Sequence, residues 1–129
     1  MRYSKGMNNF VPLRVISCYS FLKSGLTMER IAQGVSKDGY FGVGLCDKGV
    51  MYGVPEFVKT MENLKLPTIL GIETNFDDDT LCLYAINETG YRHLLLLSTT
   101  IQKQTFDREL LKNNTEGLIA VIVFCSNVV

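Results

Sequence analysis

Two carboxylates lie where this sequence could hold a metal ion. Asp47 ends the apolar run YFGVGLCD, and Glu73 lies near the end of the apolar run PTILGIETN. In parallel α/β folds the working side chains gather at the carboxyl ends of strands, so neighbouring strands would bring Asp47 and Glu73 to one pocket. Two carboxylates alone predict at most a weak Mg²⁺ site, because Mg²⁺ keeps most of its water ligands.

Few other side chains could complete such a site. The single histidine, His93, falls in the middle of an expected helix, whereas a hydrolytic zinc or manganese site needs several imidazoles. A nucleophile such as Cys18 or Ser20 would need a nearby base, and His93 is badly placed for that role. The four cysteines contain no C-x-x-C pair and predict reduced thiols rather than disulfides or a zinc knuckle. The residues alone therefore predict a poorly equipped pocket.

The composition is that of one ordinary globular domain. The chain has 129 residues, 47% of them hydrophobic, and its 13 basic and 13 acidic side chains balance. A net charge of zero gives no electrostatic footprint for nucleic acid. The chain start shows no signal-peptide pattern, and no window approaches ~18 consecutive apolar residues, so a cytoplasmic protein without a membrane partner is predicted.

Short apolar runs alternate with amphipathic stretches along the chain. This order is typical of βαβ units and predicts an α/β fold with mostly parallel strands and alternating helices. The short acidic turn after the third strand makes a local hairpin of the third and fourth strands an alternative to parallel pairing. The last strand has no helix after it, which favours a piece of a larger fold. The expected strands are 11–17, 40–47, 67–75, 80–86 and 117–125, and the expected helices are 27–39, 54–65, 87–103 and 106–113.

Several of these blocks together resemble a known family. FVPLRVISCYSFLKSGLTMERI, VGLCDKGVMYGVPEFVK, LPTILGIE and LCLYAINETGYRHLLLLST follow one another as in the amino-terminal PHP (polymerase and histidinol phosphatase) domain of bacterial DNA polymerase III alpha subunits. The resemblance runs from about residue 10 to residue 124. It implies the first half of a distorted β/α barrel, since such a barrel typically needs ~250 residues. Residues 1–129 would then form a single partial domain.

The resemblance also implies that a metal centre has been lost. Asp47 and Glu73 match ligands of the metal-competent family members. Arg14 and Lys48 would repel a dication, and a salt bridge from either of them to Asp47 or Glu73 could take the place of the metal. The positions at which the family carries histidines are occupied here by Pro12, Arg14, Ile16 and Lys48, with Thr80 near a further one.

The implied function is that of a degenerate, non-catalytic structural or interaction domain, with no cofactor of its own. The full polymerase would carry out template-directed DNA synthesis with Mg²⁺ as a nucleotidyltransferase. Its partners would be the remainder of the polymerase chain, template-primer DNA, the sliding clamp and a proofreading subunit. Two alternatives stay open: a metal-dependent PHP phosphoesterase or 3′ exonuclease, and a stand-alone binding module. In isolation, exposed strands such as 117–125 predict marginal stability or self-association.

Overall fold

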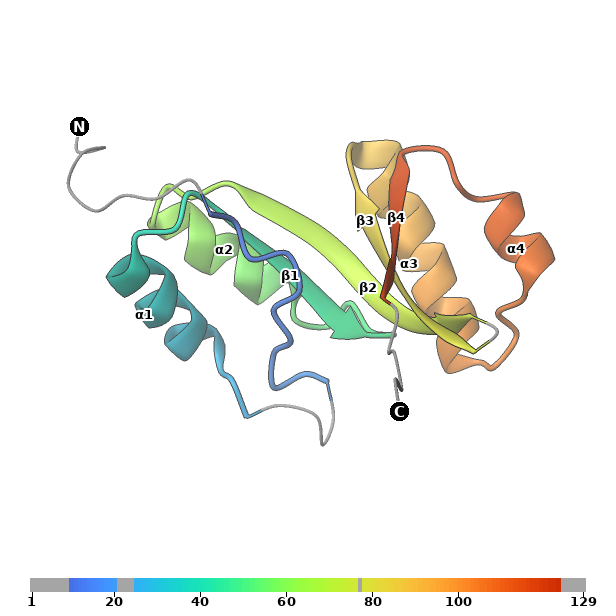
Figure 1. Cartoon of the computed structure of the whole chain (residues 1–129), viewed down its shortest axis with the longest axis horizontal. Helices are drawn as coiled ribbons and strands as arrows, with labels where there is room; N and C mark the ends of the chain where they lie inside the picture. The colour runs from blue at the N-terminus through green and yellow to red at the C-terminus, as the bar shows by residue number, and fades with distance from the viewer. Residues whose placement is uncertain (1–9, 21–24, 77, 124–129) are drawn as a thin grey trace, which may run out of the picture.

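The computed structural model describes residues 10–20, 25–76 and 78–123 (Figure 1). Helices and strands alternate over its first half, and a strand hairpin, two helices and a last strand follow. No helix in the described ranges combines the length and the hydropathy that a bilayer-spanning segment requires. The elements are α1 (Met28–Asp38), β1 (Val43–Lys48), α2 (Val54–Asn63), β2 (Thr68–Phe76), β3 (Asp79–Ala85), α3 (Glu88–Gln102), α4 (Arg108–Lys112) and β4 (Leu118–Val123).

The four strands form one mixed sheet in the order β1-β2-β3-β4. Strands β1 and β2 are parallel, whereas β2 with β3 and β3 with β4 are antiparallel. The prediction of mostly parallel strands is therefore wrong for the second half of the sheet. The alternative of a hairpin after the third predicted strand is confirmed, as β2 and β3. The connection between β2 and β3 is too short for a crossover, so it can join only antiparallel strands.

The direction of β4 follows from the two helices before it. Helix α3 begins directly after β3, and α4 with the residues behind it returns the chain to the end of β3 (Figure 1). There the backbone N–H of Ile86 donates to the carbonyl of Gly117 at 2.9 Å, so that β4 starts where β3 ends. Of the predicted strand 117–125, residues 118–123 are confirmed, and residues 124 and 125 lie outside the described ranges.

The predicted strand 11–17 is largely an extended segment beside β1. It forms a single parallel bridge, Val15 with Leu45, and its neighbouring backbone bonds include Gly44 N–H to the Pro12 carbonyl at 2.7 Å. Proline has no N–H to donate, which limits the ladder at this end. The contact is close: a Cβ at Gly44 would lie 2.7 Å from the Leu13 carbonyl oxygen.

The helix ends agree with the signals in the sequence. The Thr27 side chain accepts the N–H of Arg30 at the start of α1, and Gly39 ends this helix at φ 66°. The Asn87 side chain accepts the N–H of Gly90 at the start of α3. The predicted helices 27–39, 54–65 and 87–103 are thus confirmed to within two residues at either end, and 106–113 is confirmed as a shorter helix, α4.

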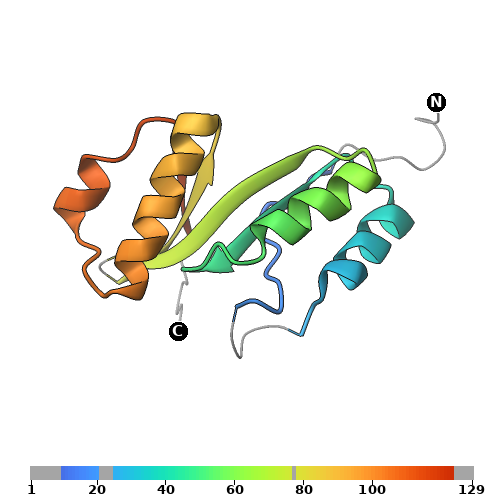
Figure 2. The ribbon, with the colours of Figure 1, turned by 180° about the vertical axis from the view of Figure 1, so that it is seen from behind.

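The helices α1, α2 and α3 cover one face of the sheet (Figure 2). The main core lies between them and the sheet, and its fully buried members include Phe57 on α2, Ile72 on β2 and Leu94 on α3. A smaller apolar cluster of Cys46, Cys82 and Tyr84 lies on the other face, which we call the open face of the sheet. The two faces therefore carry different side chains from the same strands, and this decides where the candidate ligands point.

Candidate functional site

The register of β1 and β2 separates the two predicted carboxylates. Asp47 pairs with Ile72, and Lys48 pairs with Glu73. Successive side chains on a strand point to opposite faces, so Asp47 shares the helix-covered face with Ile72, while Glu73 and Lys48 share the open face. The prediction that Asp47 and Glu73 converge on one pocket is wrong. In the register of the two strands, Glu73 lies one residue beyond the partner of Asp47, which is enough to place the two carboxylates on opposite faces.

Glu73 is the centre of an ion cluster on the open face. Its side chain is only 2% exposed, and both of its oxygens are engaged. Arg14 donates to Oε1 through Nε at 2.7 Å and contacts the same oxygen through Nη2 at 2.5 Å. The Nζ of Lys48 lies 2.8 Å from Oε2. The predicted salt bridge is therefore present at Glu73, and both cations contribute to it.

The charge states in this cluster are stabilised by the contacts. Burial alone raises the pKa of the Glu73 carboxyl, but the hydrogen bonds and charges of Lys48 and Arg14 outweigh this effect and hold the pKa below its usual value. The hydrogen bond to Glu73 likewise raises the pKa of the Arg14 guanidinium. The contacts between Arg14 and Glu73 therefore favour the charged form of both groups.

Asp47 has a different role, on the other side of β1. Its carboxylate is 1% exposed and accepts three hydrogen bonds: from the N–H and the Oγ of Ser17 at 2.6 and 2.7 Å, and from the Oγ of Ser20 at 2.8 Å. The Oγ of Ser20 in turn accepts the backbone N–H of Lys48 at 2.9 Å. This network ties the turn after the first extended segment to the end of β1. It leaves Asp47 occupied by neutral donors.

Tyr84 crosses the open face beside the ion cluster. Its ring lies over Gly71, where a Cβ would come within 2.6 Å of the ring, and its hydroxyl donates to the carbonyl of Leu13 at 2.9 Å. Burial raises the pKa of Tyr84, and it also raises the pKa of the neighbouring Cys46 thiol. Tyr84 therefore fixes the segment that carries Arg14 from a second point. Sequence reasoning missed this contact, for which the only signal was a glycine inside a strand.

The other positions at which the resemblance implies ligands carry no imidazole or carboxylate. Pro12 offers only a backbone carbonyl, which Gly44 already uses, and Ile16 has no donor atom in its side chain. Thr80 pairs with Asn75 on β2, two residues along the ladder from the Glu73–Cys82 pair. Across residues 10–20, 25–76 and 78–123, no group of three or more His, Cys, Asp or Glu side chains could hold a metal ion. The residues present do not fit the metal centre that the family implies.

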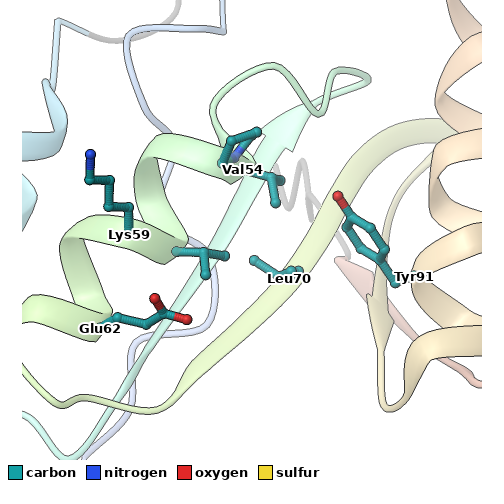
Figure 3. A pocket seen from close by; sticks show the side chains of 7 residues that line it. Val54, Lys59, Glu62, Leu70 and Tyr91 are labelled. Carbon is teal, nitrogen blue, oxygen red and sulfur yellow. The ribbon is translucent and has the colours of Figure 1, made fainter.

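A groove that the sequence did not predict lies on the helix-covered face, between α2 and α3 (Figure 3). It has a volume of about 490 Å³, with Leu70 of β2 at its floor, Lys59 and Glu62 on one side and Tyr91 on the other. The groove is on the face of the sheet opposite to Glu73. It brings no nucleophile or base to the ion cluster.

Comparison with known proteins gives this geometry a family. The PHP domain model matches residues 12–127. The DNA polymerase III subunit alpha of Bacillus subtilis is 32% identical over 88% of this chain, and that of Rickettsia felis is 35% identical over 93% of it. This chain spans only 11% of the length of either relative.

A solved structure supports the same fold. A protein from Bifidobacterium adolescentis, assigned as a metal-dependent phosphoesterase, aligns with 74% of this chain and 35% of its own, at a TM-score of 0.54 and 18% identity. At this identity the likeness concerns the fold alone. The match of the family model over residues 12–127, together with the α/β fold, shows that the chain belongs to the PHP domain family.

Proposed function

We propose that this chain is a non-catalytic part of a PHP domain in a bacterial replicative DNA polymerase, where it serves for structure and interaction. One observation carries the proposal: both oxygens of Glu73 are engaged by Arg14 and Lys48, at the place where a metal ligand would be needed. A dication approaching Glu73 would be repelled by the two positive charges of Arg14 and Lys48. It would also have to displace one of these cations from the carboxylate in order to bind an oxygen.

The remaining parts of the proposal rest on the polymerase relatives. The whole protein would be a cytoplasmic nucleotidyltransferase that copies a DNA template. The Mg²⁺ and the carboxylates for that reaction would belong to other parts of such a polymerase. Its partners would be the rest of the polymerase chain, template-primer DNA, a sliding clamp and a proofreading subunit.

A metal titration tests the non-catalytic role. We expect no saturable binding of Mn²⁺ or Zn²⁺ by isothermal titration calorimetry and no metal-dependent hydrolysis of p-nitrophenyl phosphate or of a DNA 3′ end. The matched control is the double variant Arg14→His/Lys48→His, which places two imidazoles beside Glu73 and is expected to gain measurable Mn²⁺ binding. Tight binding of one Mn²⁺ by the unchanged chain, with metal-dependent hydrolysis, would overturn the proposal.

That outcome would favour the second candidate, a metal-dependent phosphoesterase. The Bifidobacterium protein, which is assigned that activity, has a similar fold. The third candidate, a stand-alone binding module, is tested by the native gene. An open reading frame of polymerase length with an acidic catalytic triad downstream supports the replicase. A reading frame that ends after codon 129 favours the binding module instead.

A further inference from the structure

Within the part of the chain that the structure describes, the ion cluster at Glu73 pairs two cations with a single carboxylate. Arg14 and Lys48 contribute two positive charges, and Glu73 contributes one negative charge. The carboxylate next to Lys48 in the sequence, Asp47, belongs to the opposite face and accepts hydrogen bonds from Ser17 and Ser20. Cys82 pairs with Glu73 on the open face and packs there with Cys46 and Tyr84. Within residues 10–20, 25–76 and 78–123, no second carboxylate forms an ion pair with Arg14 or Lys48.

Both cations keep unused hydrogen-bond donors and access to solvent. Of the five N–H groups of a guanidinium, the Arg14 side chain uses two on Glu73, and the Lys48 ammonium uses one of its three. Within the described part of the chain, neither side chain makes a hydrogen bond or ion pair with an acceptor other than Glu73. Their side chains are 42% and 36% exposed, although Glu73 itself is 2% exposed.

The buried carboxylate fixes the spacing of the two cations. Arg14 contacts Oε1 and Lys48 contacts Oε2, so one oxyanion already bridges them from the inside. A second oxyanion can bridge the same two cations from the solvent side in the same manner, with a planar fork from Arg14 and a point charge from Lys48. The two cations would then lie between two anions, Glu73 on the inside and the ligand on the solvent side, and the second positive charge would be neutralised.

We propose that Arg14 and Lys48 form a binding site for a phosphate group, held in place by Glu73. The inference rests on the proposed function, because it requires that these two cations, and no metal, occupy the site. A phosphate group suits the pair because its several oxygens accept a bidentate contact from arginine and a separate contact from lysine. The group could belong to free phosphate or to the 5′ end of an oligonucleotide.

Calorimetric titration of the whole chain with inorganic phosphate at low ionic strength tests this site. We expect saturable binding that weakens at least tenfold in the Lys48→Met variant, which keeps an unbranched side chain of similar length and removes its charge. The matched control is Lys59→Met on α2, an exposed lysine on the opposite side of the sheet, and its affinity should change less than twofold. Equal effects of the two variants, or no saturable binding, would overturn the site.

Two further arms separate the possible causes. A 5′-phosphorylated dinucleotide and its 5′-hydroxyl form distinguish a nucleic acid end from free phosphate. If the phosphorylated dinucleotide binds more strongly than inorganic phosphate does, the ligand is a nucleic acid end. Titrations repeated with Mn²⁺ and with EDTA separate this inference from the proposed function. Phosphate binding that needs Mn²⁺ refutes both, whereas absence of phosphate binding and of Mn²⁺ binding refutes the phosphate site alone. If Lys48→Met does not fold, as judged by circular dichroism, Arg14→Gln is measured against the same control.

Discussion

The substitution Glu73→Gln tests the ion cluster most directly, because it removes one charge and keeps the shape of the side chain. Glu73 accepts two contacts from Arg14 and one from Lys48, and hydrogen bonds to charged groups contribute about 1.5–3 kcal/mol each. Both cations are about two-fifths exposed and regain water when the carboxylate is lost, so the simple total must be reduced. We expect a loss of roughly 2–3 kcal/mol in the free energy of unfolding at pH 7.

The pH dependence gives this prediction a second signature. The pKa of Glu73 is lower in the folded chain than its ordinary value, so its contribution is fully present above the ordinary pKa and is lost as the pH falls through the folded pKa. The difference between the unchanged chain and Glu73→Gln should therefore be largest near neutral pH and shrink below about pH 4.

Urea unfolding at several pH values between 3 and 7, followed by circular dichroism, measures both effects. The control is Glu62→Gln, which removes an exposed carboxylate on α2 and should change the free energy of unfolding by less than about 0.5 kcal/mol. If Glu73→Gln behaves like this control at pH 7, the cluster contributes nothing and the reasoning fails. A loss that stays constant down to pH 3 would show that the effect is one of packing and not of charge.

Two further substitutions test the other features of the fold. Asp47→Asn leaves the Ser17 and Ser20 donors facing a neutral amide in a buried place and should cost about 1–3 kcal/mol in urea unfolding, more than Glu62→Gln in the same assay. Val121→Lys puts a charge on the edge strand β4 and should reduce the self-association of the chain in sedimentation experiments. Its matched control is Leu95→Lys on α3, since both side chains are 41% exposed. Equal effects of the two lysines would mean that β4 is not the associating surface.

The helices could be predicted from the sequence because their signals are local. Thr27 and Gly39 bracket an amphipathic stretch, and Asn87 caps the next long one, so that caps and periodicity agree. The strand directions depend on non-local pairing. A short connection after β2 indicated a hairpin, but nothing in the segment 103–117 shows that it returns the chain to the end of β3.

The site could be predicted only in part, for a related reason. The resemblance to the PHP family implied a salt bridge from Arg14 or Lys48 to Asp47 or Glu73, and it is confirmed at Glu73. The convergence of Asp47 with Glu73 depended on the register of two strands, and a shift of one residue reverses the face. Two continuously apolar strands can pair in more than one register, so the residue types do not determine which residues lie opposite one another.

The presence of a second cation at Glu73, Lys48, is not explained by its contribution to the stability of the fold. The Arg14 guanidinium, bound through Nε and Nη2, already neutralises the carboxylate. Lys48 adds one contact that water partly screens, because its own side chain is 36% exposed, and it restricts a side chain whose rotamer entropy amounts to about 2 kcal/mol. The two positive charges also repel each other across the carboxylate. Lys48 therefore adds little net stability, so Lys48→Met is expected to fold, and the surplus charge is better explained by an anionic ligand than by the fold.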